Sequence, residues 1–321
     1  MLFVERHLMK KTILFAGLTL ALAACIATPA GAGNTAYLAQ AGTGTSPCLE
    51  AAPCGTMAQA IPAAGLNGEV VCLNRGNFHS AIISQSVTIS CGDDLWEAPA
   101  DIIAINTPAG SSVSIEGLAL DGSGASNYSP FQFTGQGSLR LHHVRIGNHP
   151  GSNTDGLLFA PNGAAKLNVS DSSFYNTGTG TGGGIVINPT SGGIAQVALE
   201  RVTVTGNAFG IAADGSNSTG GINMTIADSM IAGNSQDGIV AVTPSGGAPI
   251  GVMVTNTKSV NNAIGIRSIG TTVTVRVKNS DVMGNGTGLS FSGGGVLATY
   301  GNNAVNANAV NGAFSGSIPL Q

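Results

Sequence analysis

The sequence predicts an all-β solenoid in which the chain winds into a parallel β-helix with a short helix at its N-terminal end. A segment of alternating apolar and polar residues recurs seven times between residues 113 and 282, at intervals of 23 to 30 residues. A second apolar segment, opened by glycine, follows in most units, and an asparagine occupies one repeat position in four successive units. Period-two alternation indicates strands with one buried face, and a fixed spacing indicates stacked repeats.

The first repeated segment has apolar residues at its first, third and eighth positions in nearly every copy. Its copies are VSIEGLAL (113–120), LRLHHVRI (139–146), LNVSDSSF (167–174), VALERVTV (197–204), MTIADSMI (224–231), VMVTNTKS (252–259) and VRVKNSDV (275–282). We expect the fourth and fifth positions to form a corner. The second segment begins at Gly156, Gly184, Gly210, Gly238, Gly265 and Gly288. Each coil of about 26 residues is therefore predicted to carry two or three short strands.

The asparagines Asn207, Asn234, Asn262 and Asn285 stand just before these glycines and predict a turn ladder. Asparagine tolerates the left-handed backbone of a tight corner, and stacked amides can hydrogen-bond from coil to coil. Leucine-rich repeats have a similar length but need a leucine consensus that is absent here. A β-sandwich would not keep one turn residue in register over four units.

The composition agrees with a regular, tightly turning fold. The chain has 321 residues, of which 48 are glycine, 43% are hydrophobic, 5% are aromatic and 9% are charged. Such a chain can bury a core of small aliphatic side chains in thin layers, so disorder is not expected.

Residues 1–32 are predicted to be a signal peptide, which implies a secreted or periplasmic protein. Lys10 and Lys11 precede an apolar run at residues 12–24, and small residues suited to cleavage end at position 32. The run is too short to span a membrane, so we expect no transmembrane span. Translation can start at Met1 or Met9. A lipoprotein cleaved before Cys25 is the minor alternative.

The mature chain is predicted to be acidic and disulfide-bonded. Without residues 1–32 it keeps nine basic and 15 acidic residues, a net charge of −6, so nucleic acid is not an expected partner. Its four cysteines, Cys48, Cys54, Cys72 and Cys91, predict two disulfides in an exported protein. Zinc binding is the competing interpretation, but no CxxC motif or histidine pair supports it.

Residues 56–78, TMAQAIPAAGLNGEVVCLNRGNF, resemble the segment that opens many members of the pectin lyase-like superfamily. The resemblance implies a right-handed β-helix, the usual hand of parallel crossovers. It also implies a helix capped by Thr56, whose Met57, Ala60 and Ile61 cover the open end of the solenoid. We therefore divide the chain into a leader (1–32), an N-terminal cap (33–67), the β-helix (68–305) and a C-terminal tail or cap (306–321).

Cys72 and Cys91 lie about one coil apart in the sequence, so we expect the stacking of coils to bring them close enough to form a disulfide. Equivalent Cα atoms of stacked coils are about 5 Å apart, within the range that a disulfide accepts. Cys48 and Cys54 would then close a small loop in the cap. Two other connectivities remain open from the sequence alone.

The tetrapeptide Asn153-Thr154-Asp155-Gly156 resembles the start of the catalytic signature of polygalacturonases. Inverting hydrolysis needs two carboxyls roughly 6.5–9.5 Å apart, but the next coil, residues 180–189, has no carboxylate. The Asp93-Asp94 pair lies upstream, no histidine follows His149, and 276–278 (RVK) is an ordinary repeat strand. We therefore interpret Asp155 as a polar turn residue before a strand, like Asp237.

The densest polar segment contains the other candidate catalytic residues, Arg140, His142 and Arg145. Lyases of the superfamily remove a proton beside a uronate carboxylate with an arginine or lysine, often with Ca²⁺. Because Ca²⁺ takes six to eight oxygens and Glu116 stands nearly alone on this face, we expect no metal and no cofactor here; Ca²⁺ belongs only to the lyase alternative. A solvated patch is the favoured interpretation.

A charged column, His143, Asp171, Arg201 and Asp228, is predicted at the fifth position of four consecutive coils and indicates ion pairing between coils. Because the enzyme signatures are incomplete, the sequence favours a non-catalytic envelope or secreted protein that contacts glycans or another surface. A divergent polysaccharide lyase or glycoside hydrolase that acts on acidic polysaccharide is the alternative.

Overall fold

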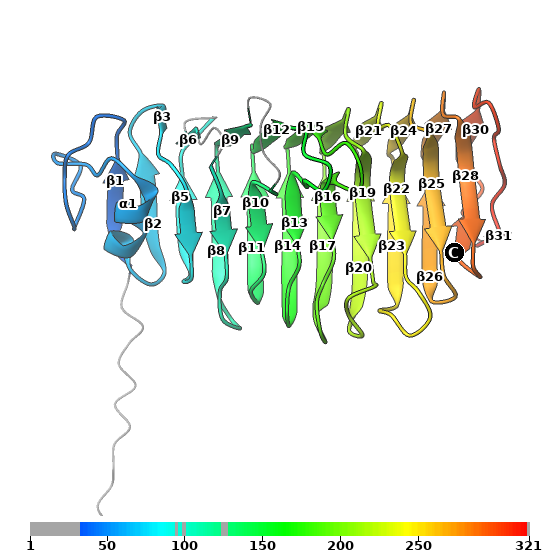
Figure 1. The fold of residues 1–321 in the computed structure, drawn as a ribbon, viewed down its shortest axis with the longest axis horizontal. Helices are drawn as coiled ribbons and strands as arrows, with labels where there is room; N and C mark the ends of the chain where they lie inside the picture. Colours follow the sequence, from blue (N-terminus) through cyan, green and yellow to red (C-terminus); the bar gives the residue numbers. More distant parts are fainter. Residues whose placement is uncertain (1–32, 94–95, 98–100, 123–127, 320–321) are drawn as a thin grey trace, which may run out of the picture. The chain divides into compact units, whose positions relative to one another are not determined.

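A computed structural model describes residues 33–93, 96–97, 101–122 and 128–319, which form a parallel β-helix with three sheets. Sheet 1 contains β1 (Thr35–Leu38), β2 (Gly68–Cys72), β5 (Val87–Ser90), β8 (Ser112–Glu116), β11 (Gly137–His142), β14 (Ala164–Ser170), β17 (Ile194–Glu200), β20 (Gly221–Ala227), β23 (Ile250–Thr255), β26 (Val273–Lys278), β29 (Val296–Thr299) and β31 (Gly316–Ser317). Figure 1 shows these strands side by side along the solenoid.

Sheets 2 and 3 complete each coil. Sheet 2 contains β3 (Gly76–Asn77), β6 (Trp96–Glu97), β9 (Leu118–Asp121), β12 (Arg145–His149), β15 (Ser173–Thr177), β18 (Thr203–Thr205), β21 (Met230–Ala232), β24 (Lys258–Val260), β27 (Asp281–Met283) and β30 (Ala304–Asn306). Sheet 3 contains β4 (Ala81–Ile83), β7 (Ile103–Ile105), β10 (Phe131–Phe133), β13 (Leu157–Phe159), β16 (Gly183–Ile187), β19 (Phe209–Asp214), β22 (Asp237–Val242), β25 (Ile264–Ile269) and β28 (Thr287–Ser292).

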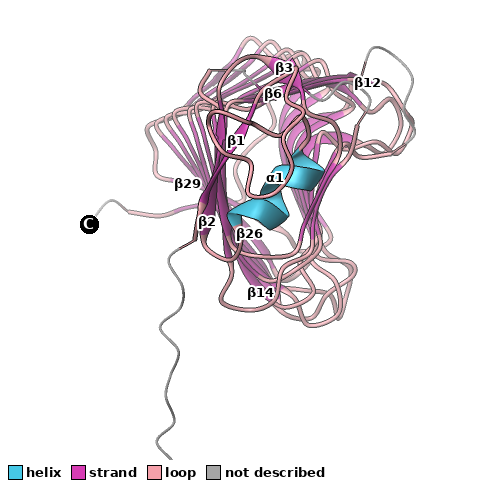
Figure 2. Cartoon of the chain, turned by 90° about the vertical axis from the view of Figure 1, so that its left-hand side faces the viewer, coloured by secondary structure: helices cyan, strands magenta, loops and turns pink. Residues whose placement is uncertain are grey.

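The coils stack in parallel register and wind with a right hand, as predicted. Leu139 of β11 pairs with Leu167 of β14, which pairs with Val197 of β17. Viewed from the N-terminal end, the chain passes from β2 on the left to β3 at the top while successive coils recede (Figure 2). This clockwise, receding path is a right-handed helix.

The repeated eight-residue segment covers two strands, one in sheet 1 and one in sheet 2, with the predicted corner between them. The corner arises because the fifth residue adopts a left-handed backbone, with φ of 49° at His143, 52° at Asp171 and 51° at Arg201. Gly117, Asp228, Asn256 and Asn279 have the same conformation at this position. The glycine-opened segments that follow form sheet 3.

Small aliphatic side chains from all three sheets fill the core, and a few large aromatic ones lie in the early coils. Trp96, Phe131, Phe133, Phe159 and Phe174 are fully buried. The rings of Phe133 and Phe159, in adjacent strands of sheet 3, stack with centroids 4.8 Å apart.

The asparagine ladder runs through the interior of the corner between sheets 2 and 3. The amide nitrogens of Asn207, Asn234 and Asn262 donate to the side-chain oxygen of the next asparagine at 3.1, 2.8 and 3.1 Å. Asn285 continues the ladder to Asn308 at 2.9 Å. At the other end the Thr177 hydroxyl donates to Asn207 Oδ1 at 2.6 Å.

The prediction that the ladder asparagines adopt the left-handed backbone of a tight corner is wrong. None of the four has a positive φ; the left-handed residue is the one before each of them. These residues are Gly206 (φ 68°), Gly233 (φ 64°), Asn261 (φ 56°) and Gly284 (φ 70°). Asparagine is therefore favoured by its side-chain hydrogen bonds, and not by tolerance of the turn conformation.

The helix α1 (Met57–Ala64) lies across the N-terminal end of the core (Figure 2). Met57, Ala60 and Ile61 are buried, as expected for a cap. Thr56 precedes the helix in an extended conformation, but its hydroxyl donates to Gln59 Oε1 at 3.2 Å and makes no capping bond to the backbone. The expected Thr56 side-chain cap is thus wrong.

Two disulfides tie the N-terminal coils together. Cys48 bonds to Cys54, and Cys72 bonds to Cys91 with Cα atoms 4.6 Å apart. These pairings exclude the other two connectivities and the zinc interpretation. Paired cysteines are typical of proteins in oxidising, extracytoplasmic compartments.

Sheet 1 extends beyond the predicted limits of 68–305 at both ends. β1 pairs with β2, and β31 pairs with β29. The predicted leader at 1–32 and the alternative at Cys25 lie outside the described residues. Within the described part of the chain, no helix has the length and apolar character needed to cross a membrane.

Candidate functional site

The structure divides the four candidate catalytic residues between three sheets. Arg140 and His142 lie on β11 of sheet 1, and Arg145 opens β12 of sheet 2 just past the corner. Asp155 lies beyond the other end of β12, two residues before β13 of sheet 3. The five residues of β12 span about 16 Å at ~3.3 Å per residue, so Asp155 does not join the arginine and histidine side chains.

Asp155 anchors two neighbouring coils. Its Oδ1 accepts a hydrogen bond from the Gly183 backbone N–H at 3.0 Å, and its own N–H donates to Ser129 Oγ at 3.0 Å. The Ser129 hydroxyl also lies 3.5 Å from Asp155 Oδ2. Burial raises the pKa of Asp155 to about 6, although these hydrogen bonds partly offset the effect.

We expect Asp155→Asn to gain stability relative to the wild type as the pH rises. The pKa of Asp155 is raised from 3.8 to about 6 in the folded chain, so ionisation is disfavoured there and the wild type loses stability between about pH 4 and pH 6. Asparagine keeps the acceptor for Gly183 and carries no charge. Urea unfolding at pH 4 and pH 7 should show the difference between variant and wild type shift by roughly 1–3 kcal/mol in favour of the variant.

The exposed Glu50→Gln variant is the control for this experiment. It removes a carboxylate that is not buried, so its stability relative to the wild type should change little over the same pH range. A difference between Asp155→Asn and the wild type that is the same at pH 4 and pH 7 would contradict a raised pKa at Asp155.

Asp237 occupies the equivalent position three coils later and is also buried. Its Oδ2 lies 3.6 Å from Arg267 Nη1, and burial raises its pKa while the charge of Arg267 opposes the shift. The two aspartates therefore have different partners: Asp155 is held by neutral groups and Asp237 by a cation.

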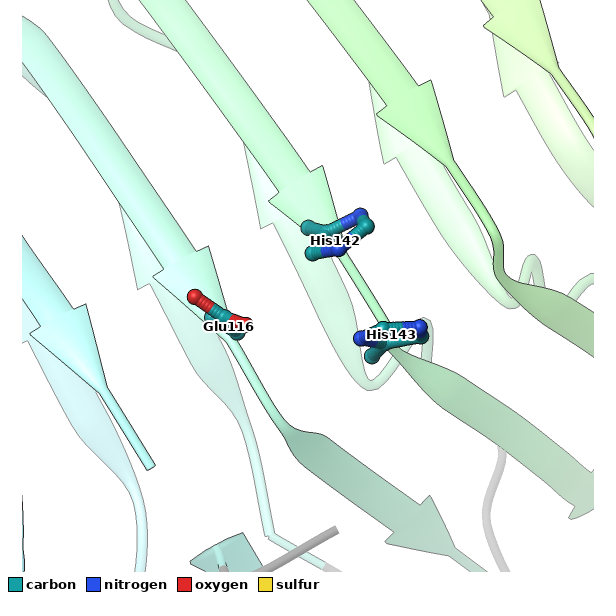
Figure 3. A group of neighbouring side chains, drawn as sticks. All are labelled: Glu116, His142 and His143. Atoms are coloured by element: carbon teal, nitrogen blue, oxygen red, sulfur yellow. The ribbon is translucent and has the colours of Figure 1, made fainter. Parts of the chain in front are cut away.

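The histidine corner comprises Asp93, Glu116, His142, His143 and Asp171, at the turn from sheet 1 to sheet 2 (Figure 3 shows its three central residues). The rings of His142 and His143 have centroids 4.0 Å apart. His142 Nδ1 lies 3.0 Å from Ser170 Oγ and 3.5 Å from Asp171 Oδ2, and His143 Nδ1 lies 3.5 Å from Asp93 Oδ1.

The charged column predicted along this corner forms in part. Arg201 binds Asp171 through two hydrogen bonds of 2.7 and 2.8 Å, which lower the pKa of Asp171 more than burial raises it. Arg201 also contacts Glu200. Arg201 therefore pairs with the acidic residues Asp171 and Glu200, and Asp228 accepts a hydrogen bond from Asn256 of the next coil.

The Arg145 trough is a depression of about 280 Å³ on the outer face of sheet 2, walled by Arg75, Glu97, Asp121, Arg145 and Tyr175. Arg145 is exposed, and Arg75 pairs with Glu97 through Nη2 and Oε1 at 2.5 Å. The Asn148 amide donates to both oxygens of Asp121 at 3.0 Å. The depression thus carries both hydrogen-bond donors and acceptors.

Two small residues leave space for the trough. Ala119 lies in register between Glu97 and Arg145, and Gly147 lies between Asp121 and Tyr175. The ring of Tyr175 packs directly on Gly147. A Cβ added at that glycine would lie 2.3 Å from the nearest ring carbon. The ring therefore occupies space that a side chain at residue 147 would need, so glycine at this position permits its place beside the depression.

Two further depressions carry less convergent chemistry. One of about 440 Å³ is lined by the corner residues Arg201, Asp228, Met230, Asn256 and Lys258, of which Asp228 and Asn256 bond to each other. Another depression, of about 290 Å³, lies where strands β8, β11, β14 and β17 of sheet 1 begin. Its lining contains Lys166 and Gln196 among mostly small residues. The Arg145 trough combines cations, carboxylates and an aromatic ring.

Sequence reasoning identified Arg145 but missed Arg75, Glu97, Asp121 and Tyr175. The signal lay in the repeat register, since Glu97 and Asp121 fall at the strand positions that pair across coils toward Arg145 and Tyr175. Arg140, in contrast, lies on the outer face of sheet 1 between Ser114 and Asn168 and does not line the trough.

No protein-family model matches the chain, and no curated protein matches it in sequence. Solved structures that it resembles include the A-module of mannuronan C-5 epimerase AlgE4 from Azotobacter vinelandii, at 13% identity and TM-score 0.49, covering 82% of this chain and 94% of that one. Pectate lyase Pel9A gives 14% identity and TM-score 0.45, covering 87% and 80%. The A-module of A. vinelandii AlgE6 gives 13% and 0.39, covering 84% and 92%.

Proposed function

We propose that this protein is exported and binds glycans in the Arg145 trough without cleaving them. The trough carries the proposal, because it gathers the groups that recognise sugars on one outer face of a rigid sheet. The guanidinium of Arg145 presents several N–H donors in a fixed fork, and the carboxylates of Glu97 and Asp121 accept hydrogen bonds from hydroxyls. Tyr175 adds an aromatic surface with a hydroxyl tip.

The trough has the volume of a small ligand pocket and continues into a neighbouring depression. Pockets that enclose drug-sized ligands have volumes of about 300–1,000 Å³, and the trough has about 280 Å³. A second depression of about 250 Å³, lined by Asp93, His143, Arg145 and Asp171, adjoins it at Arg145. A chain of sugars that crosses sheet 2 can therefore contact both depressions while most of its surface stays in water.

The placement of Asp155 argues against hydrolysis by the polygalacturonase-like motif. Asp155, whose pKa is raised by burial, lies across the width of sheet 2 from Arg145, and its hydrogen-bond partners are Ser129 and Gly183. A hydrolase needs a second carboxyl at roughly 6.5–9.5 Å. Export is supported by the two disulfides, which are typical of oxidising compartments, together with the leader predicted at residues 1–32.

A glycan array followed by calorimetric titration of the best ligand tests the proposal. We expect Arg145→Ala and Tyr175→Ala each to weaken binding at least tenfold, which is about 1.4 kcal/mol. Arg276→Ala on β26 of sheet 1 is the control, because it removes an arginine far along the solenoid, and it should bind like the wild type.

The same samples distinguish binding from catalysis. The wild-type protein incubated with uronate oligomers should release no unsaturated ends, which absorb in the ultraviolet, and no shorter oligomers. Product formation that Arg145→Ala abolishes would replace the binding proposal by the lyase alternative. Failure to bind any glycan, or equal binding by wild type and Arg145→Ala, would contradict a role of the trough.

A further inference from the structure

We propose that the histidine corner binds a divalent transition-metal ion through Glu116, His142 and His143. One ligand atom from each of these residues lies within 4.8 Å of the other two. Figure 3 shows the two imidazoles side by side, with Glu116 on the neighbouring strand. The site goes beyond the proposed glycan binding, and it needs no glycan to form.

The backbone brings the three side chains together from two coils. Glu116 is the direct register partner of His142 in sheet 1, so the two side chains share the outer face one strand apart. Successive residues of a strand normally point to opposite faces. The left-handed conformation of His143 (φ 49°) breaks this alternation and places its ring 4.0 Å from that of His142.

The separation of the ligand atoms fits a metal ion after a small closure. Ligands at ~2.1 Å from a tetrahedral zinc ion are about 3.4 Å apart, so the most distant pair must close by about 1.4 Å. The side chains of His142 and His143 are 24% and 44% exposed and have room to rotate. A change of side-chain rotamers, with no backbone movement, can supply that distance.

Each of the two imidazoles has a carboxylate near its Nδ1 atom. Asp171 Oδ2 lies 3.5 Å from His142 Nδ1, and Asp93 Oδ1 lies 3.5 Å from His143 Nδ1. Metal-bound histidines almost always donate their second ring N–H to a carboxylate, carbonyl or water, which orients the ring. Arg201 in turn fixes Asp171 through two hydrogen bonds. Ser170 Oγ, 3.0 Å from His142 Nδ1, is a further partner for that nitrogen, so in this proposal Nε2 of each histidine is the metal ligand.

The ligand set selects the type of metal. Two imidazoles and one carboxylate suit Zn²⁺ and its neighbours Co²⁺, Ni²⁺ and Cu²⁺, whereas Ca²⁺ requires six to eight oxygens. Three protein ligands leave a fourth position for water or a ligand group, as in zinc sites that are not purely structural. His143 of this ligand set also lines the depression formed with Asp93, Arg145 and Asp171.

Calorimetric titration with Zn²⁺ tests the site on the disulfide-bonded protein, purified without a polyhistidine tag and stripped with chelator. We expect one saturable site per chain, and we expect His142→Ala, Glu116→Gln and His143→Asn each to weaken it at least tenfold. Asparagine is chosen for His143 because the equivalent corner residues Asn256 and Asn279 keep the left-handed backbone. Visible absorption of the Co²⁺ form reports nitrogen ligation independently.

His79→Asn is the matched control. His79 is also left-handed (φ 63°) and lies 3.8 Å from a carboxylate, Asp101, but it is not part of the corner. This variant should bind Zn²⁺ like the wild type. The absence of saturable binding by the wild type, or equal weakening by His79→Asn and His142→Ala, would overturn the proposal. Because no glycan is present, neither outcome depends on the function of the Arg145 trough.

Discussion

We expect Asn234→Ala to lower the free energy of unfolding by about 3 kcal/mol, because it leaves several buried groups without hydrogen-bond partners. Asn234 is 2% exposed, and its Oδ1 accepts from both the backbone N–H and the side-chain amide of Asn207 at 3.0 and 3.1 Å. Its own amide donates to Asn262 Oδ1 at 2.8 Å. Urea denaturation of the variant and the wild type, followed by circular dichroism, measures the loss.

Asn223→Ala is the control for the ladder. Asn223 lies in β20 of the same coil, but its side chain is exposed on the outer face of sheet 1. Its replacement should change the free energy of unfolding by less than about 0.5 kcal/mol. If the two variants were equally stable, the ladder would not contribute to the fold in the way that its hydrogen bonds indicate.

A still larger loss is expected for Phe159→Ala, about 4 kcal/mol, which is the usual cost of truncating a buried phenylalanine to alanine. Phe159 is fully buried in β13 and stacks on Phe133 of β10 with ring centroids 4.8 Å apart. Removal of the ring leaves a cavity between coils that a regular backbone cannot close. Thermal or urea unfolding measures the effect.

Ile82→Ala provides the matched control in sheet 3. Ile82 of β4 points outward with 79% of its surface exposed, so truncation should have little effect on stability. A loss for Phe159→Ala no larger than that for Ile82→Ala would show that the early coils are not packed around the aromatic rings.

The fold could be predicted from the sequence because each coil repeats the same physical pattern. Alternation in segments such as LRLHHVRI gave the buried faces of two strands, and the spacing of Asn207, Asn234, Asn262 and Asn285 gave the register. The same spacing extends to Asn308, 23 residues after Asn285, so the end of the ladder could also have been found. The start at Thr177 could not, since threonine replaces asparagine there.

The candidate site was less predictable because it depends on backbone angles and on contacts across coils. That His142 and His143 point to the same side follows from the left-handed φ of His143, which strand alternation does not reveal. That Tyr175 lies beside Arg145 follows from the small residue at Gly147. Repeat lengths vary from 23 to 30 residues, so counting along the chain does not fix which side chains meet.

The chemistry gathers where the repeat is least regular. The ladder is built from asparagine from Asn207 onward, but in the preceding coils Thr177 and His149 occupy the paired positions. The Arg145 trough and the histidine corner belong to these same early coils. Departures from the pattern that specifies a fold are expected at functional sites.

Cross-linking between coils tests most directly the in-register stacking on which the trough, the histidine corner and the ladder all depend. Arg140 and Asn168 are register partners on adjacent strands, as are Arg140 and Ser114, whereas Ser114 and Asn168 lie two strands apart. Adjacent strands are about 4.8 Å apart and alternate ones about 9.6 Å, and cysteines with Cα atoms more than about 7 Å apart cannot be bridged.

The measurement is non-reducing peptide mapping by mass spectrometry of two double variants. Arg140→Cys with Asn168→Cys should form a disulfide beside the native Cys48–Cys54 and Cys72–Cys91 bonds, while Ser114→Cys with Asn168→Cys should keep free thiols. A bond in the second variant, or free thiols at positions 140 and 168 under oxidising conditions, would contradict the stacked, parallel arrangement of these coils.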